Sequence, residues 1–163
     1  MKGKKLLIGL LAAVVLVAVT VAPVMADTGT TDITGNVPAV LELTAPSAIA
    51  LGDMSPAASP DTGSSATPGS VKCNDQDGYT VTVESNKADG KMQSPTTNTL
   101  TNALDVTTGS LSGVTVTTTP QTCVDTSAPG ETSIDLSVSQ VIAYTDAADT
   151  GYSITLTYTA SAK

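Results

Sequence analysis

The last stretch of the sequence constrains the fold most, because residues 152–160 alternate strictly between two faces. Tyr152, Ile154, Leu156, Tyr158 and Ala160 share one face, and Ser or Thr fills every position between them. This period of two is that of a β-strand with one buried face. We predict a terminal strand here, with the first four of these side chains in a core.

The rest of the chain repeats this pattern in shorter runs. No helical period occurs after residue 26, and runs rich in Thr and Val are separated by Gly, Pro, Asn, Asp and Ser. Strands are predicted at 32–37, 40–45, 49–51, 79–85, 104–107, 114–119, 133–144 and 152–160, with shorter pieces around Val71 and Met92. This spacing predicts an all-β fold, a single immunoglobulin-like or jelly-roll-like sandwich of about 7–9 antiparallel strands.

The first 26 residues are predicted to be a secretory signal helix and not part of this fold. Lys2, Lys4 and Lys5 precede an apolar run, and Val24 and Ala26 have the arrangement that a signal peptidase recognises. The run is also long enough to span a bilayer, so an uncleaved membrane anchor is one alternative. A type IV pilin leader is another. All three export the remaining 137 residues, and we expect a secreted, cell-surface protein.

The exported part is expected to contain an arm and one domain. Residues 27–45, named here the N-terminal arm, include an apolar segment ending before Pro46, and Pro38 and Pro46 both favour extended geometry in the residue before them. Residues 46–163 form the predicted sandwich. Within them, residues 55–70 contain three Pro and no large apolar residue, which predicts a surface loop.

The charge of the exported part limits its partners. It has four Lys, no Arg and fifteen acidic residues, which gives a net charge of −11. Such a surface repels phosphate groups, so neither nucleic acid nor anionic lipid is an expected partner. A membrane contact is expected only through the N-terminal segment, if it is not cleaved.

The composition also argues against catalysis. The chain has no His, the commonest general base, and no Arg to clamp a phosphate or carboxylate. A carboxylate pair that meets only in space is the one catalytic arrangement left open. We expect no enzyme and no cofactor.

The best metal candidate is the segment 73–84, CNDQDGYTVTVE. Asp75, Asp77, Gly78 and Glu84 fall on four positions of a calcium-binding loop, but Cys73 occupies its first position. Residues 79–84 alternate as a strand, which would carry Glu84 away from the turn. We predict a polar turn that needs the backbone freedom of Gly78, and no metal site. Calcium at Asp75 and Asp77 is the alternative.

Cys73 and Cys123 are the only cysteines. In an exported chain such a pair is predicted to form a disulfide, and closing a loop of this length contributes about 4 kcal/mol of stability. The chain has no Trp and no Phe, so its core must be built mainly from aliphatic side chains. We therefore expect the stability of the domain to depend on the disulfide, on neighbouring copies, or on both.

The N-terminal arm suggests how a chain without catalytic groups could act. Its apolar side chains could add a strand to a neighbouring copy, and a head-to-tail repeat of that contact gives a filament. The candidate donor residues are Ile33, Val37, Val40, Leu41 and Leu43. Alternatively, the arm is the first strand of its own sandwich.

The order of segments also resembles a known group of proteins. After the signal come VPAVLELTAPSAIALGDMSP, the 55–70 loop, GYTVTVESN and GYSITLTYTASAK. This layout is similar to that of exported β-sandwich surface proteins of bacteria and archaea, including subunits of donor-strand filaments and WxL-type domains. The resemblance implies a surface location and, for the filament relatives, structural assembly. Tyr158 stands where a WxL domain has Trp, which counts against cell-wall binding of that kind.

We therefore expect a structural subunit of an extracellular filament, pilus or matrix, with copies of itself as partners. The alternative is an adhesion or binding module, monomeric or anchored. Such a module would recognise another cell-surface component through the loops 55–70 or 146–151.

Overall fold

The computed structural model describes residues 30–57 and 59–163, and strands are the regular secondary structure found in them. The chain divides into two units, Met1–Asn36 and Val37–Lys163. The described residues of the first unit, 30–36, are exposed and form neither helix nor strand. The predicted signal helix lies outside the described residues.

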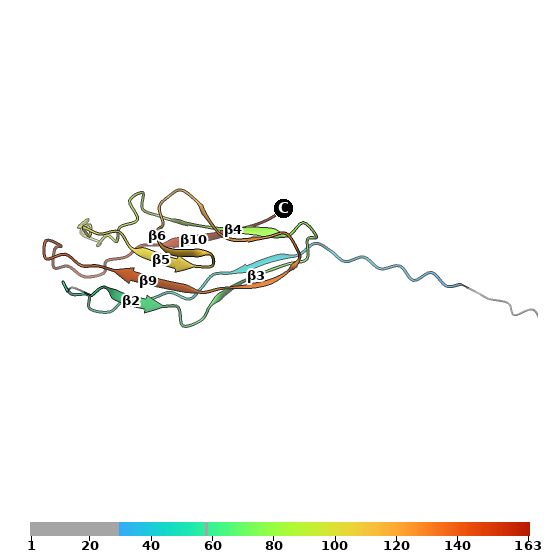
Figure 1. Ribbon diagram of the computed structural model, residues 1–163, viewed down its shortest axis with the longest axis horizontal. Helices are drawn as coiled ribbons and strands as arrows, with labels where there is room; N and C mark the ends of the chain where they lie inside the picture. The colour runs from blue at the N-terminus through green and yellow to red at the C-terminus, as the bar shows by residue number, and fades with distance from the viewer. Residues whose placement is uncertain (1–29, 58) are drawn as a thin grey trace, which may run out of the picture. The chain divides into compact units, whose positions relative to one another are not determined.

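The described part of the second unit contains ten strands in three antiparallel sheets (Figure 1). The sheet orders are β1-β3-β8, β2-β9-β5-β6 and β10-β4-β7. The all-β prediction is confirmed, with more strands than expected. The strands are β1 (Leu41–Thr44), β2 (Asp61–Ser64), β3 (Gly69–Cys73), β4 (Tyr79–Ser85), β5 (Asp105–Thr108), β6 (Leu111–Thr115), β7 (Gln121–Thr126), β8 (Gly130–Ile134), β9 (Leu136–Gln140) and β10 (Leu156–Ala162).

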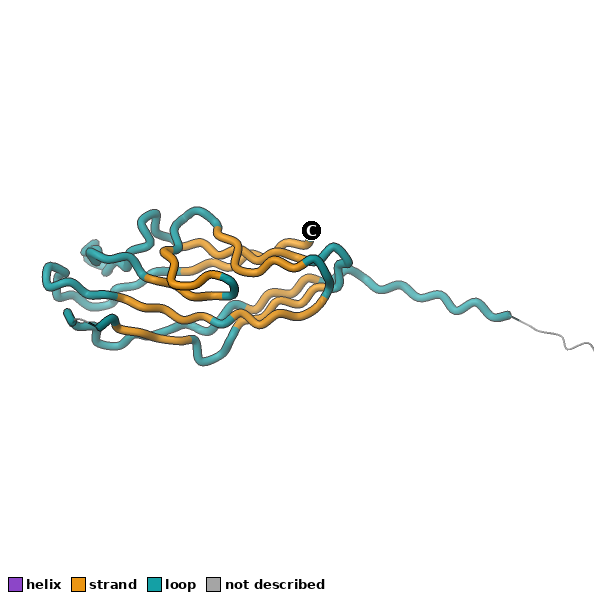
Figure 2. The backbone as a smooth tube through the Cα atoms, viewed as in Figure 1, coloured by secondary structure: helices purple, strands orange, loops and turns teal. Residues whose placement is uncertain are grey.

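The first two sheets continue into each other. β2 leads through a short turn into β3, and only Asp135 separates β8 from β9. In Figure 2 β8 and β9 follow each other almost without interruption, and a loop joins β2 to β3. The third sheet contributes β4, β7 and β10 to the same hydrophobic core, so the arrangement is sandwich-like.

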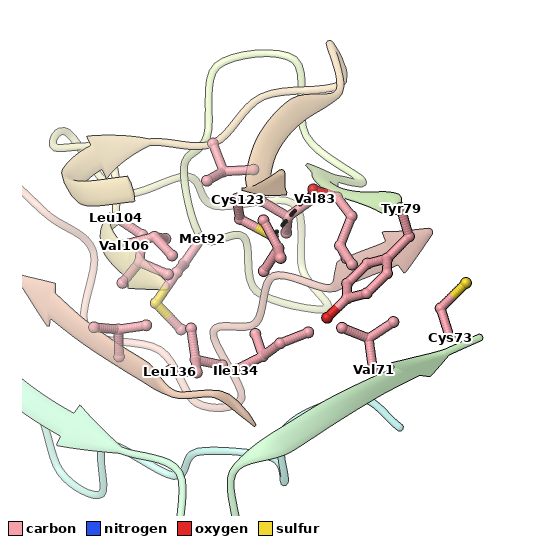
Figure 3. Close-up of a cluster of buried hydrophobic side chains, with 14 of the residues drawn as sticks. Val71, Cys73, Tyr79, Val83, Met92, Leu104, Val106, Cys123, Ile134 and Leu136 are labelled. Atoms are coloured by element: carbon pink, nitrogen blue, oxygen red, sulfur yellow. Dashed lines mark hydrogen bonds between the residues drawn. The ribbon is translucent and has the colours of Figure 1, made fainter. Parts of the chain in front are cut away.

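The core follows from alternation along the strands. In β4 the side chains of Tyr79, Val81 and Val83 are buried and the threonines between them are partly exposed. β9 buries Leu136 and Val138 in the same way. The side chains meet in a single cluster (Figure 3). Its buried members are Val71, Cys73, Tyr79, Val81, Val83, Met92, Leu100, Leu104, Val106, Val116, Cys123, Val124, Ile134, Leu136 and Val138.

Two tyrosines connect the third sheet to the other two. The hydroxyl of Tyr79 on β4 shares a hydrogen bond of 2.6 Å with the hydroxyl of Thr132 on β8. The hydroxyl of Tyr158 on β10 shares one of 3.1 Å with that of Thr108 on β5. Each ring contributes apolar area to the core while its polar end is satisfied.

A β-bulge in the third sheet buries two consecutive residues, Cys123 and Val124. Val81 pairs with Val124, but Thr82 pairs with Thr122, so Cys123 is the extra residue. Next to it, Gly109 in the β5–β6 turn has a φ of 55° and leaves no room for a Cβ beside the carbonyl of Cys123. This close approach packs the turn against β7.

The predicted strands agree with the structure at 40–45, 79–85 and 104–107, where β1, β4 and β5 lie. The other positions need correction. No strand forms at 32–37 or 49–51, and 133–144 is two strands that are interrupted at Asp135 and end at Gln140. Alternation predicts which segments can adopt an extended conformation. A strand also needs a neighbouring strand to bond with, and the local sequence does not determine whether there is one.

The remaining differences concern the ends of strands. The predicted strand 114–119 overlaps only the end of β6, which stops at Thr115. The next strand, β7, begins after Pro120. β10 begins only at Leu156, because Ser153 instead forms an isolated bridge with Gln93. The predicted surface loop 55–70 contains β2 and the beginning of β3.

The predicted disulfide is not formed in this structure. Both cysteines are free and buried. Cys73 ends β3 in the first sheet, whereas Cys123 lies on β7 in the third, and Figure 3 shows the Tyr79 side chain between them. Pairing requires a close approach of the two backbones, which the separation in sequence does not determine.

Candidate functional site

An open groove of about 980 Å³ lies within the second unit, beside the edge of the third sheet. Residues 45–56, which connect β1 to β2, form one wall. Residues 146–158, which lead into β10, form the other. The floor is apolar and consists of Met92, Leu100, Leu104, Leu136, Val138 and Ile142.

The first wall is an extended segment that runs beside β2 without forming a strand. The N–H of Ser47 donates to the carbonyl of Thr67 at 3.0 Å, and the N–H of Thr67 donates to the Ser47 hydroxyl at 3.0 Å. Ile49 and Leu51 pack over Gly63, where a Cβ would lie only 2.5 Å from the Ile49 side chain. The absence of a side chain at Gly63 therefore lets this wall approach the sheet.

The second wall carries the four side chains predicted for the terminal strand. Tyr152, Ile154, Leu156 and Tyr158 all line the groove, are partly buried, and pack against the core. Ser153 and Thr155, on the other face, are exposed. The apolar face of this segment thus packs partly against the core and partly faces the open groove.

Polar contacts hold the second wall to residues 94–101. Oδ1 of Asp146 accepts hydrogen bonds from the N–H of Thr101 at 2.7 Å and from its hydroxyl at 2.6 Å. Asp149 accepts from the hydroxyl of Thr96 and from Nδ2 of Asn98, the latter at 3.0 Å. We name these two aspartates and three partners the polar clamp. Sequence analysis does not predict the clamp, because the bonded partners lie more than 40 positions apart.

Both carboxyl groups of the polar clamp have a lowered pKa. For Asp149 the main cause is the hydrogen bond from the Thr96 hydroxyl. For Asp146, burial acts to raise the pKa, but hydrogen bonds from Thr101 and from the N–H of Ala143 outweigh it, so the pKa falls below its ordinary value. The clamp is therefore made by ionised carboxylates.

Residues 38–40 of the N-terminal arm are bonded to Asn74. Oδ1 of Asn74 accepts from the N–H of Val40 at 2.7 Å, and its Nδ2 donates to the carbonyl of Pro38 at 2.7 Å. The N–H of Asn74 also donates to the carbonyl of Val40 at 3.2 Å. Asn74 therefore holds residues 38–40 in place immediately before β1.

The structure divides the five candidate donor residues into two groups. Leu41 and Leu43 belong to β1, where they pair with Cys73 and Val71 of the same chain. Ile33 and Val37 precede it and are 94% and 82% exposed, and Val40 between the two groups is 41% exposed. Leu41 and Leu43 are thus committed to pairing within their own chain, whereas residues 30–37 of the arm are exposed and unpaired in the structure.

The metal candidate is a polar turn. The N–H of Asp77 donates to Oδ1 of Asp75 at 3.0 Å, and Gly78 has a φ of 84°. Glu84 lies near the far end of β4, opposite Thr157, and does not return to the turn. Among residues 30–57 and 59–163, no group of three or more His, Cys, Asp or Glu side chains is placed to hold a metal ion.

The part of the chain that the structure describes contains no helix long and apolar enough to cross a membrane. No model of a known protein family matches the sequence. A search of curated proteins finds no match either.

Proposed function

We propose that this protein is a structural subunit of an extracellular surface filament, pilus or matrix. Its sheets form an immunoglobulin-like or jelly-roll-like sandwich, and the subunits assemble by strand addition between copies. The protein acts through contact with other macromolecules and not through catalysis.

The observation that carries the proposal is the open apolar groove beside β10. Sandwich cores are normally closed by their own side chains, whereas core residues such as Met92, Leu136 and Val138 reach this open space. Apolar surface left open in this way favours an interaction partner. The groove lies between residues 45–56 and the residues that lead into β10, and an extended strand is the partner that we propose for it.

The exposed part of the N-terminal arm has the matching composition. Ile33 and Val37 lie four positions apart, so in an extended chain they share one face, with Gly35 between them. Within residues 30–37 the only charge is Asp32, on the other face. Asp53, Asp146 and Asp149 line the groove, and the apolar face of the arm brings no negative charge towards them.

Substitutions in the arm test the proposal. The double variant Ile33→Asp, Val37→Asp places two charges on the apolar face, and Thr34→Asp, Asn36→Asp places the same charges on the opposite face. We expect the exported wild-type protein and the second variant to form polymers in negative-stain microscopy and sedimentation. The first variant should remain monomeric with an unchanged melting temperature. A wild-type protein that stays monomeric, or equal polymerisation of both variants, contradicts the proposal.

The second candidate function is an adhesion or binding module. It is favoured by Tyr144, which is 89% exposed on the loop after β9 and is one of only four aromatic residues. Exposed tyrosines are common at recognition surfaces. Monomers that bind cell-surface material, and lose that binding on Tyr144→Ala, would support this candidate instead.

A further inference from the structure

The hydrogen bonds between β10 and β4 determine which backbone groups of β10 remain free. The N–H of Asn86 donates to the carbonyl of Thr155 at 3.0 Å, and the N–H of Lys163 donates to the carbonyl of Gly78 at 3.2 Å. Because backbone groups alternate in direction along an antiparallel strand, the odd-numbered residues from 155 to 163 point towards β4. The N–H and C=O groups of Leu156 and Tyr158 therefore point away from it.

These free groups lie at the groove. β10 is an edge strand, paired only with β4 in the described part of the chain, and Leu156 and Tyr158 both line the groove. An edge with unpaired backbone groups next to open apolar surface is a template for another strand. Backbone pairing and side-chain burial are thus both possible at the same two residues.

We infer that the arm of a second copy pairs with the backbone of Leu156 and Tyr158 and extends the sheet β10-β4-β7 by one strand. Its Ile33 and Val37 side chains enter the groove. This inference rests on the proposed function and specifies the edge at which the partner binds.

The exposure of the arm favours a second copy as the source of the strand. Ile33 and Val37 are 94% and 82% exposed, so within the described residues nothing covers their apolar side chains. Asn74 in the β3–β4 turn holds residues 38–40 through its hydrogen bonds with Pro38 and Val40, and the exposed residues before them can reach a neighbouring subunit.

Amide hydrogen exchange tests the inference on the full chain. We compare the assembled wild-type protein with the Ile33→Asp, Val37→Asp variant. The amides of Leu156 and Tyr158 should exchange about tenfold more slowly, or slower still, in the assembled wild-type protein than in the variant. The amides of Thr157 and Thr159 point towards β4 and should be protected in both, which provides an internal control.

The outcomes separate the two proposals. If the wild-type protein assembles but the Leu156 and Tyr158 amides exchange equally in both samples, the inferred edge is wrong and the proposed function stands. If the wild-type protein does not assemble, both are wrong.

Substitution at Leu156 gives a second test. Leu156→Pro removes the N–H that faces the groove, whereas Leu156→Ala shortens the side chain and keeps the N–H. We expect the Pro variant to lose assembly and the Ala variant to retain more of it, with melting temperatures measured for both. Equal assembly of the two variants would overturn the inference, and the exchange experiment decides the matter if the Pro variant does not fold.

Discussion

At the scale of single residues, the core relies on tyrosine for its only aromatic area. Tyr79 is 1% exposed and spans from β4 to Thr132 on β8. Tyr158 reaches Thr108 on β5, and burial raises its pKa. The sequence alternation places both tyrosines on the apolar face of a strand, but it does not reveal the hydroxyl partners, which are 53 and 50 positions away.

Removing the Tyr79 hydroxyl should destabilise the protein. Tyr79→Phe leaves the Thr132 hydroxyl without its partner in a partly buried site, and we expect a loss of about 1 kcal/mol in the free energy of unfolding. Urea denaturation measures this. Tyr144→Phe is the control, because that exposed side chain should leave stability unchanged. Equal effects of the two substitutions would show that the bond contributes nothing.

At the scale of elements, the second wall of the groove depends on the polar clamp. Residues 146–155 do not belong to any of the ten strands. They are held by the hydrogen bonds of Asp146 and Asp149 and by the isolated bridge between Gln93 and Ser153. Hydrogen bonds between loops and ionised carboxylates are stronger than neutral ones. The position of this wall therefore depends on the polar clamp and not on pairing between strands.

Acid should weaken this wall. The folded pKa values of Asp146 and Asp149 lie below the ordinary value of 3.8, so their contribution to stability is present above that pH and is lost as the pH falls through the folded values. We expect the melting temperature of the wild-type protein to decrease below about pH 4. The double variant Asp146→Asn, Asp149→Asn should show a smaller decrease, and an equal decrease would contradict this role.

At the scale of the whole molecule, the proposed assembly would bring together copies of an acidic protein. Residues 27–163 have a net charge of −11, so approaching copies repel each other at low ionic strength. The groove itself is mainly apolar, and salt does not weaken apolar burial. Ionic strength should therefore favour assembly.

Sedimentation at two salt concentrations tests this effect. We expect more polymer at about 0.5 M NaCl than at about 0.02 M, because the Debye length shortens from more than 20 Å to less than 5 Å. The Ile33→Asp, Val37→Asp variant should stay monomeric at both concentrations. A decrease in wild-type assembly with added salt would indicate that ion pairs, and not apolar contacts, join the subunits.

The sequence alone determined the fold class and most of what faces the core. The alternation in 79–85 and 152–160 is a local property of the chain, and it reappears in β4 and in the apolar faces of Tyr152, Ile154, Leu156 and Tyr158. Turn chemistry was equally local, as the φ of Gly78 illustrates. These features need no knowledge of distant residues.

Which apolar faces are covered and which edges are paired depends on the way the whole chain folds. The tertiary structure placed Leu41 and Leu43 in β1, kept Cys73 and Cys123 apart, and left β10 with an unpaired edge beside an open groove. A period of two shows that a strand has an apolar face, but pairing and burial depend on segments far away in the chain. The groove is therefore a property of the folded chain and not of any one segment.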